Sequence, residues 1–237
     1  MIKRAILLAG GKGTRLKPFT KILPKPLMPI GKFTILEIVI KQLKYYGFRH
    51  ITITVNHQAK LIKAFLGNGK KFNVTIDYAL EKKPLGTMGP LKGIKDLPDN
   101  FLVMNGDILT DLNFNKLYNI HKKNKNLFTI SSYKRKDSID YGLLKINKKN
   151  TLIKFVEKPN KIYQVSMGIY IIEKKIIKYL PNNRYFGFDH LMYKLLKLKK
   201  NVKVINHNGY WLDIGKPEDY INAIKQFKKM KNRLLHI

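Results

Sequence analysis

The feature that most constrains this chain lies at its start, where a short apolar strand runs directly into a glycine turn. Residues 5–9 are uniformly apolar, which is typical of a buried strand. The turn and the residues that close it are Gly10, Gly11, Lys12, Gly13, Thr14 and Arg15. A glycine turn after a strand offers bare backbone N–H groups to phosphate oxygens, and an arginine beside it adds permanent charge. The segment therefore predicts a binding site for a nucleoside triphosphate.

This turn matches neither of the two common phosphate-binding glycine loops. A Walker A loop needs a lysine directly followed by Ser or Thr, and here Gly13 separates Lys12 from Thr14. The dinucleotide fingerprint needs a third glycine where this chain has Leu16. A second cation, Lys25, follows between two prolines, which fix the backbone around it. A plain tight turn with surface cations is the less favoured interpretation, because both cations follow the glycines closely.

Strand and helix patterns alternate through the first half of the chain. Apolar residues recur at helical spacing in four segments, which are residues 35–46, 58–66, 86–93 and 113–124. Strand-like runs lie between or after them, at residues 51–55, 74–79, 101–104 and 127–133. This order predicts an α/β fold, with a Rossmann-like, doubly wound, mostly parallel sheet.

The pattern changes after about Asp137, where short strands joined by turns replace the alternation. Strands are expected at 142–146, 151–157 and 167–172, so residues 138–172 are predicted to form a β-rich, antiparallel insertion. The remaining helices and strands are expected at 173–180, 189–198, 202–205, 210–214 and 217–232. We expect a single domain over residues 1–237, without a C-terminal β-helix domain.

The large positive charge needs an interpretation of its own. The chain has 47 Lys and Arg against 15 Asp and Glu, a formal net charge of +32. Nucleic-acid binding is one interpretation. However, the lysines are spread along the whole chain, and no zinc-finger or RNP-like motif accompanies them. A solvated lysine-rich surface, which also attracts small polyanions, is favoured.

Composition also bears on the cellular setting. The chain contains no cysteine, which excludes disulfides and thiolate metal sites and fits the cytoplasm. No apolar run approaches the roughly 20 residues that span a bilayer, and the first run is too short for a secretory signal. The histidines are isolated from one another and none is assigned to a metal; they are His50, His57, His121, His190, His207 and His236. We expect a cytoplasmic protein with no membrane or nucleic-acid partner.

Beyond the glycine turn, motif after motif resembles one enzyme family. The turn is followed by Pro-Lys-Pro-Leu-x-Pro-Ile at residues 24–30. The later motifs, in family order, are Leu85-Gly86-Thr87, Asn105-Gly106-Asp107, Tyr141-Gly142, Glu157-Lys158-Pro159, Met167-Gly168-Ile169-Tyr170 and Trp211-x-Asp213-Ile214-Gly215. This ordered set resembles the sugar-1-phosphate nucleotidylyltransferases, most of all guanylyltransferases that act on mannose or heptose phosphates. The resemblance implies that a sugar 1-phosphate attacks the α-phosphate of a nucleoside triphosphate, giving an NDP-sugar and pyrophosphate.

The resemblance also implies roles for individual residues. Arg15 would grip the departing pyrophosphate, and Lys25 would contact the reacting phosphates. Asp107 and Asp213 would hold one Mg²⁺, although each could instead be an ordinary turn or capping carboxylate. The nucleotide would be bound by Leu8, Ala9, Gly10, Gly11, Gly13, Thr14, Glu81, Gly86, Thr87 and Asp107. The sugar phosphate would be bound by Tyr141, Gly142, Glu157, Lys158, Ser166 and Gly168.

Glu81 bears on which base is used. A carboxylate only accepts hydrogen bonds, so it suits guanine, whose N1–H and N2 amino group lie side by side, better than uracil or thymine. GTP is therefore favoured, with a uridylyl-, thymidylyl- or cytidylyltransferase as the alternative. Met88 stands where the family has alanine, and it is expected to bring a bulky side chain toward the nucleotide.

Some questions stay open at this level. Ser166 stands where relatives often carry Asn, so the sugar is not identified. A non-catalytic sensor of nucleotide sugars is the rival from a different class, and the retained Arg15, Lys25, Asp107 and Asp213 disfavour it. The expected partners are a nucleoside triphosphate and a sugar 1-phosphate, and the sequence leaves a homo-oligomer open.

Overall fold

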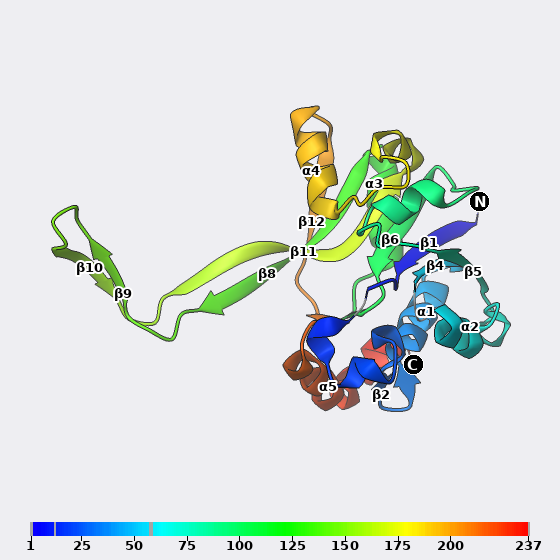
Figure 1. The fold of residues 1–237 in the computed structure, drawn as a ribbon, viewed down its shortest axis with the longest axis horizontal. Coiled ribbons are helices and arrows are strands. Elements are labelled where there is room, and N and C mark those ends of the chain that lie inside the picture. The colour runs from blue at the N-terminus through cyan, green and yellow to red at the C-terminus, as the bar shows by residue number, and fades with distance from the viewer. Residues whose placement is uncertain (1, 12, 57–58, 237) are drawn as a thin grey trace.

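A twisted sheet of seven strands forms the centre of the protein (Figure 1). The computed structural model describes residues 2–11, 13–56 and 59–236. The order across the sheet is β12-β8-β11-β6-β1-β4-β5. These strands span Val202–His207, Phe128–Ser138, Asn160–Glu173, Asn100–Asn105, Lys3–Leu8, Phe48–Val55 and Thr75–Leu80, respectively. All neighbours pair in parallel except β11, which runs antiparallel to both β6 and β8. The predicted mostly parallel α/β sheet is confirmed.

Helices cover both faces of this sheet, as the doubly wound prediction requires. The α-helices are α1 (Ile35–Tyr45), α2 (Ala59–Leu66), α3 (Phe114–Lys123), α4 (Phe188–Lys197) and α5 (Pro217–Leu235). Gln58, the first residue of the helix expected at 58–66, lies outside the described residues, as do Lys12 and His57. Among the residues described, no helix is long and apolar enough to cross a membrane.

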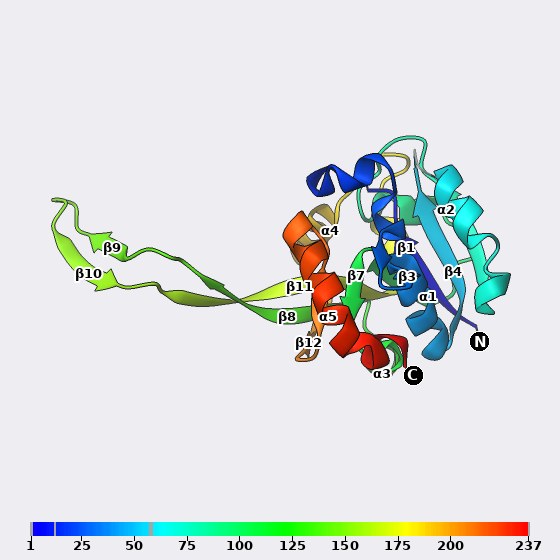
Figure 2. The ribbon, with the colours of Figure 1, turned by 90° about the horizontal axis from the view of Figure 1, so that it is seen from below.

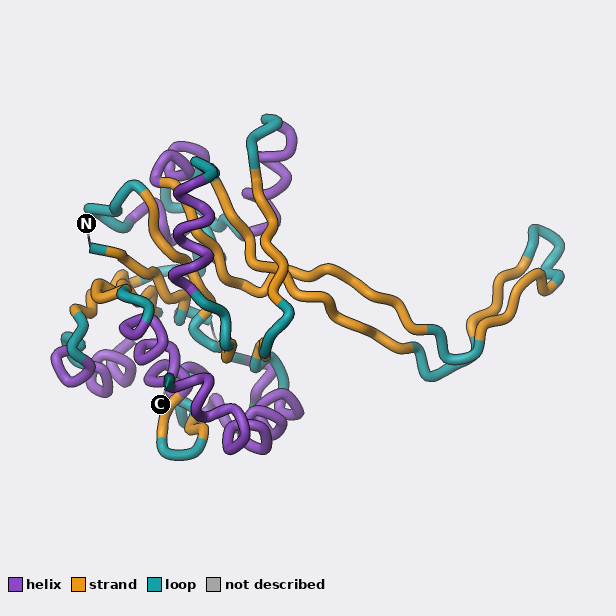
Figure 3. The backbone as a smooth tube through the Cα atoms, turned by 180° about the vertical axis from the view of Figure 1, so that it is seen from behind, coloured by secondary structure: helices purple, strands orange, loops and turns teal. Residues whose placement is uncertain are grey.

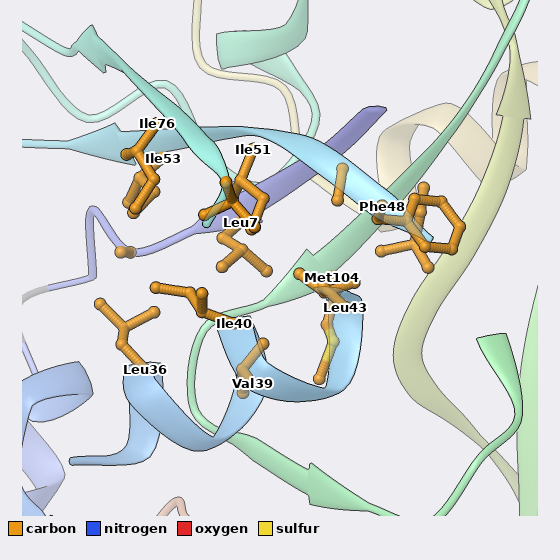
Figure 4. Packing of buried hydrophobic residues seen from close by; sticks show 14 of the residues in the cluster. Leu7, Leu36, Val39, Ile40, Leu43, Phe48, Ile51, Ile53, Ile76 and Met104 are labelled. Carbon is orange, nitrogen blue, oxygen red and sulfur yellow. The ribbon is translucent and has the colours of Figure 1, made fainter. Parts of the chain in front are cut away.

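The two faces bury different side chains of the same central strands. In β1, Ala5 and Leu7 pack on the side of α1, α2 and α3, whereas Ile6 packs on the side of α4. Figure 4 shows Leu7 against Val39, Ile40 and Leu43 of α1, with Ile51 of β4 beside it. Because both faces are covered, the strands can be apolar at every position, as the sequence is at residues 5–9.

Helix α1 begins where local chemistry fixes its first turn. The Thr34 hydroxyl accepts a hydrogen bond from the Glu37 N–H at 3.2 Å, and the Thr34 N–H donates to the Glu37 carboxylate at 2.8 Å. This reciprocal capping box satisfies two N–H groups that the helix itself cannot. The helix ends before Gly47, whose φ of +84° places it in the left-handed region that glycine adopts easily.

Two short antiparallel pairings complete the body of the protein. Strand β7 (Ile108–Thr110) pairs with β13 (Trp211–Asp213), and β2 (Pro29–Ile30) pairs with β3 (Phe33–Thr34). Helix α5 covers this region and contributes Tyr220 and Phe227 to a third buried cluster with Ile214. The pairing of β7 with β13 matters for function, because it joins two distant parts of the chain beside the glycine turn.

A long arm projects from the sheet (Figure 2). Beyond Tyr133, the last residue of β8 that pairs with β12, strands β8 and β11 continue as an isolated two-stranded ribbon. We use "the arm" for residues 134–164. Its tip is a hairpin of β9 (Leu143–Ile146) and β10 (Leu152–Val156), which pair only with each other in the part of the chain described. Figure 3 shows the tip far from the body of the protein.

Several elements differ in extent or type from the sequence-based expectation. Residues 167–172, expected within the insertion, belong to β11 and lie in the main sheet between β8 and β6. The start of β11 at Asn160 was not expected. Residues 160–166 lie on a ribbon that is mostly exposed to solvent, and their sequence does not show the alternation of apolar and polar residues that indicates a strand. The segments predicted as helices at 173–180 and 86–93 are short 3₁₀ turns, Lys174–Tyr179 and Gly89–Gly93.

Candidate active site

A cavity of about 460 Å³ opens at the carboxyl edge of the parallel strands. Residues that follow β1, β4, β5 and β6 all reach it, as expected for ligand sites in open α/β sheets. Its described lining residues are Leu8, Ala9, Gly10, Gly11, Gly13, Thr14, Arg15, Leu16, Lys25, Pro26, Thr54, Asn56, Glu81, Pro84, Leu85, Gly86, Thr87, Asn105, Gly106, Asp107, Tyr185 and Gly215. The structure therefore brings every residue predicted for catalysis or nucleotide binding to one cavity.

The glycine turn is held in a compact shape by its own backbone. Gly13 has a φ of +61°, and a Cβ there would lie 2.9 Å from the Thr20 methyl group. The Gly13 carbonyl accepts hydrogen bonds from the Thr20 hydroxyl at 2.8 Å and from the Leu16 N–H at 3.0 Å. A side chain at residue 13 would thus be strained in conformation and crowded, which explains the glycine physically. Thr14 and Arg15 follow on a single 3₁₀ turn, Thr14–Leu16, with both side chains exposed.

Lys25 and Asp107 meet as an ion pair inside the cavity. Lys25 lies on the 3₁₀ turn Lys25–Leu27, and Asp107 lies between β6 and β7, directly before β7. The second carboxylate oxygen of Asp107, Oδ1, is buried and has no hydrogen-bond partner among the residues that the structure describes. A buried carboxylate oxygen without a partner is costly, so it marks a position where a ligand would be stabilised.

Asp213 is placed beside Asp107 by the pairing of β7 with β13. The Ile214 N–H donates to the Asp107 carbonyl at 3.2 Å, and Asp213 lies opposite Ile108. Although the Asp213 side chain reaches solvent, desolvation and then the Asp107 carboxylate raise the pKa of Asp213, opposed by Lys25 and Arg15. The two predicted metal ligands therefore interact electrostatically across a distance of more than 100 residues in sequence.

Asp107 and Asp213 fit a divalent cation whose other ligands are substrate phosphates and waters. Among the residues described, no group of three or more His, Cys, Asp and Glu side chains could hold a metal by itself. Mg²⁺ is usually bound by one or two carboxylates together with substrate phosphates and waters. The orphaned Oδ1 of Asp107 and the raised pKa of Asp213 are both consistent with a positive charge between them.

Glu81 also lines the cavity, and it lies directly after β5. Its carboxylate accepts a hydrogen bond from the Leu85 N–H at 3.3 Å, and the Thr54 hydroxyl bonds to it as well. A Cβ at Gly10 would lie 2.6 Å from Oε1 of Glu81, so this carboxylate touches the glycine turn. Burial raises the pKa of Glu81, and the hydrogen bonds from Leu85 and Thr54 oppose that rise.

The Leu85-Gly86-Thr87 segment closes the cavity near α4. Gly86 has a φ of +76°, and a Cβ there would lie 2.8 Å from the Phe186 carbonyl oxygen. The Thr87 hydroxyl accepts a hydrogen bond from the Phe188 N–H at 2.7 Å, which ties it to the start of α4. The expectation for Met88 was wrong: its side chain is fully buried in the core under α4 and does not line the cavity. Its size therefore does not weaken the assignment of a nucleotide to this cavity.

Comparison with known proteins agrees with this geometry. The family model described as "Nucleotidyl transferase" matches residues 4–230, which includes every residue of the cavity. The chain belongs to the nucleotidyl transferase family.

Individual relatives place the chain within that family. It is 32% identical to the D-glycero-alpha-D-manno-heptose 1-phosphate guanylyltransferase of Campylobacter jejuni over 93% of this chain and 98% of the relative. It is 31% identical to the UTP--glucose-1-phosphate uridylyltransferase of Synechocystis over 94% of this chain and 62% of the relative. The chain spans 62% to 63% of the length of the first four curated relatives that it matches.

A solved structure supports the fold as well. The crystal structure of HddC from Yersinia pseudotuberculosis complexed with GMP-PN superposes with a TM-score of 0.73 at 29% identity. The match covers 95% of this chain and 99% of that one. The sheet order and the cavity thus lie in a fold that this solved structure shares over nearly its whole length.

The residues predicted for the sugar phosphate are divided between two places in this family member. Ser166 and Gly168 lie at the base of the arm, and a Cβ at Gly168 would lie 2.6 Å from Asn105 Nδ2, which lines the cavity. The remaining four, which lie on the arm outside the cavity lining, are Tyr141, Gly142, Glu157 and Lys158. Their role in sugar binding stays a prediction, and the structure does not bring them to the cavity of the same chain.

Four lining residues with polar side chains were not among the predicted site residues. Thr54 is the second-last residue of β4, Asn56 directly follows that strand, and Asn105 ends β6. Asn56 donates a hydrogen bond to the Gly10 carbonyl, which holds the start of the glycine turn. The available signal was topological, because polar residues at the carboxyl ends of parallel strands meet at one edge. The fourth, Tyr185, lies in a loop with no such signal.

Proposed function

We propose that this protein transfers a guanylyl group from GTP to a sugar 1-phosphate of the mannose or heptose type, releasing pyrophosphate. The family supports nucleotidyl transfer in general. The choice of GTP depends on the environment of Glu81, and the choice of sugar follows the guanylyltransferases among the relatives.

The half-buried carboxylate of Glu81 is the observation that carries the choice of base. Among the residues described, its hydrogen-bond donors are the Leu85 N–H and the Thr54 hydroxyl, so acceptor capacity remains toward the cavity. Guanine offers two adjacent donors, N1–H and the N2 amino group, to a carboxylate. Uracil offers one donor between two carbonyl oxygens, and those oxygens would face the negative charge. A desolvated carboxylate therefore favours guanine by electrostatics as well as by hydrogen bonding.

The other side of the cavity suits the phosphates. The attacking oxygen of the sugar phosphate forms a bond to the α-phosphorus of GTP, and the bond from that phosphorus to the β-phosphate bridging oxygen breaks. Arg15 is exposed at the mouth of the cavity, where its two parallel N–H donors can bind the departing pyrophosphate. Lys25 lies deeper and would hold the reacting phosphate oxygens while the bond changes take place.

We assign Asp107 and Asp213 as the ligands of Mg²⁺. When bound, the ion would offset negative charge on the phosphates during transfer. In the free protein Lys25 pairs with Asp107, so the lysine neutralises this carboxylate until substrate arrives. Lys25 can then turn from the carboxylate to the phosphates, which are the stronger anions.

The alternative within the family is a uridylyltransferase. The specific observation in its favour is the 31% identity to the Synechocystis enzyme whose name gives UTP and glucose 1-phosphate. The two candidate functions differ in the base that Glu81 would contact, so a measurement of nucleotide preference distinguishes them.

The experiment is turnover of the purified protein with Mg²⁺, each of the common nucleoside triphosphates and a panel of sugar 1-phosphates, measured by pyrophosphate release. We expect GTP with a mannose- or heptose-type phosphate to give the highest kcat/KM. Higher kcat/KM with UTP or dTTP than with GTP would overturn the choice of base. Pyrophosphate release with no sugar phosphate requirement would overturn the reaction itself.

A further inference from the structure

The tip of the arm presents an apolar face that no described part of its own chain covers. Cross-strand pairing places Leu144 opposite Phe155 and Ile146 opposite Leu152, so all four side chains share one face of the hairpin. Their exposed fractions are 61%, 55%, 53% and 53%, respectively. An isolated two-stranded hairpin is marginally stable in water. A tip of this composition therefore needs a surface against which to pack.

The same face carries residues predicted to bind the sugar. Gly142 lies two residues before Leu144, and Glu157 lies two residues after Phe155, so both continue that face. The contacts agree: a Cβ at Gly142 would lie 2.5 Å from the Phe155 ring and 3.2 Å from Oε2 of Glu157. Whatever surface covers the apolar face will therefore also meet the Glu157 carboxylate, with Lys158 beside it.

The arm cannot bring this face to its own cavity without breaking its ladder. Strands β8 and β11 pair without interruption from Ser132 with Ser166 out to Ser138 with Asn160. The residues from Lys134 to Ser138 carry the tip roughly 16 Å beyond the sheet, at about 3.3 Å per residue. Figures 1 and 2 show the tip far from the body in two views at right angles.

The described lining of the cavity, for its part, lacks groups that the proposed reaction needs. Two of its described lining residues are cations, Arg15 and Lys25, whereas a triphosphate and a sugar phosphate bring four phosphate groups. Its described carboxylates are Glu81 and Asp107, which the proposed function already uses for the base and the metal. One more lysine and one carboxylate for sugar hydroxyls would complete the site, and Lys158 and Glu157 are such a pair.

Exposed apolar side chains that could receive the tip lie close in sequence to cavity residues or line the cavity, and we call them the rim. The segment directly before Lys25 exposes Phe19 by 43%, Ile22 by 80% and Leu23 by 39%. Tyr185, which lines the cavity, is 62% exposed. Both surfaces, the tip and the rim, belong to the same chain, so two copies can satisfy each other reciprocally.

We propose that the protein works as a homodimer in which each arm reaches the cavity of the other copy and supplies Glu157 and Lys158 to its sugar-phosphate site. This assignment of roles rests on the proposed function. The exchange is isologous: the tip of one copy covers the rim of the second, and the reverse contact is identical. A single copy then holds the nucleotide half of the site, and the second copy completes the sugar half.

Cross-linking tests the exchange without any need for activity. The chain has no cysteine, so single cysteines report unambiguously. A chain with Leu144→Cys, mixed during refolding or co-expression with a chain carrying Ile22→Cys, should form a covalent dimer through a short bis-maleimide. Tyr193→Cys, on the exposed face of α4, replaces Ile22→Cys as the matched control and should give little product.

Three results would overturn the exchange. They are a monomer by light scattering at working concentration, an equal yield with the Tyr193→Cys control, or cross-linking of Leu144→Cys only to itself. The last result would mean that two tips pack on each other and contribute nothing to either cavity. Because none of these measurements involves turnover, they remain decisive even if the protein fails to transfer a guanylyl group.

Mixed dimers test whether the arm completes the site. Arg15→Ala removes an exposed cavity cation, and Lys158→Asn removes the arm cation at a left-handed position, φ +42°, which Asn tolerates. Each homodimer should lose on the order of 100-fold in turnover. A heterodimer purified through two different tags should regain about half of the wild-type turnover, because one of its two sites contains neither substitution.

An arm that serves the cavity of its own chain predicts the opposite result for the heterodimer. If each cavity used its own arm, the heterodimer would contain one Arg15→Ala site and one Lys158→Asn site, and it would be as inactive as the parents. Full activity of the Lys158→Asn homodimer would also overturn the assigned role. A wild-type protein without turnover on any substrate pair would instead refute the proposed function and leave the cross-linking result to decide the exchange.

Discussion

The cavity and the arm carry motifs of the same family, but they differ in how much of their surroundings the chain itself provides. Around the cavity, residues from the ends of four parallel strands converge, and these strands contribute side chains to the buried core. On the arm, Glu157 and Gly142 lie together, yet the apolar side chains beside them face solvent. Topology alone assembles the first site, whereas the second needs another surface.

The difference shows that order along the chain does not guarantee a shared site. Asp107 and Asp213 are far apart in sequence, but the pairing of β7 with β13 joins them. Glu157 and Ser166 are only nine residues apart, but a straight ribbon separates them. The predictions below test whether the cavity and the arm depend on each other for function while remaining independent in folding.

Asp107→Asn should cause the largest loss. It removes negative charge from the metal site and weakens the partner of Lys25, while the side chain keeps its shape. Because electrostatic groups at reacting phosphates act most strongly in the transition state, we expect turnover to fall on the order of 10³-fold. Steady-state pyrophosphate release measures it, with Asp96→Asn as the control at an exposed turn. Unchanged turnover would remove Asp107 from the reacting centre.

Replacing the tip, residues 140–158, by a two-residue Asn-Gly turn should separate folding from activity. The tip belongs to none of the three buried clusters, so thermal unfolding of the body should change little. GTP binding, measured by calorimetry, should persist because the nucleotide half of the cavity is intact. Turnover should fall by about 100-fold or more, since the sugar phosphate loses its positioning groups. Loss of GTP binding together with turnover would show that the tip supports the cavity rather than the sugar.

Glu81→Gln should change nucleotide preference rather than abolish turnover. The amide can donate as well as accept, so guanine loses one of two matched hydrogen bonds and uracil gains a partner. We expect kcat/KM for GTP to fall about 10-fold or more, while kcat/KM for UTP falls less or rises. Glu218→Gln, on the exposed first turn of α5, is the matched control. An equal fall for both nucleotides would show that Glu81 does not contact the base.

Much of the fold follows from the sequence because local signals and burial agree in the body. The apolar run at residues 5–9 and the capped helix beginning at Ile35 need no knowledge of distant residues. Met88 shows the limit of such reasoning. Its position next to the Leu85-Gly86-Thr87 motif pointed to the nucleotide, but the turn after Gly86 directs the side chain into the core under α4.

The residues of the site could be predicted only where their spacing or the order of the strands was evident from the sequence. Arg15 and Lys25 follow the glycine turn closely, so their convergence could be inferred from spacing. Asn56 could have been inferred only once β4 was known to run parallel beside β1. The position of Glu157 could not be inferred at all, because residues 160–166 carry mainly polar side chains and gave no sign that β11 would extend the ribbon outward.

GTP binding should weaken on acidification at a higher pH than an ordinary carboxylate would require. Burial raises the pKa of Glu81, so this group takes up its proton earlier as the pH falls. The protonated carboxyl loses charge and acceptor capacity, and the affinity for guanine falls with it. Titration of GTP affinity against pH should show this loss in the wild type and a flat profile in Glu81→Gln. A loss of the same size in both proteins would assign the effect to another group.

Thr34→Ala should have the smallest effect, and this effect should be confined to the stability of the body of the protein. It removes one half of the capping box that begins α1, which costs about 1 kcal/mol of unfolding free energy. The substitution lies outside the cavity lining, so kcat and KM should stay unchanged below the unfolding transition. Leu144→Ala on the arm should do the reverse: at protein concentrations where dimers dissociate, the unfolding midpoint in urea should be unaffected, because the tip packs on no other part of the chain that the structure describes. A fall in that midpoint for Leu144→Ala would mean that the tip folds back on the body in solution. The arm and the body would then form one folding unit, although the structure shows them apart.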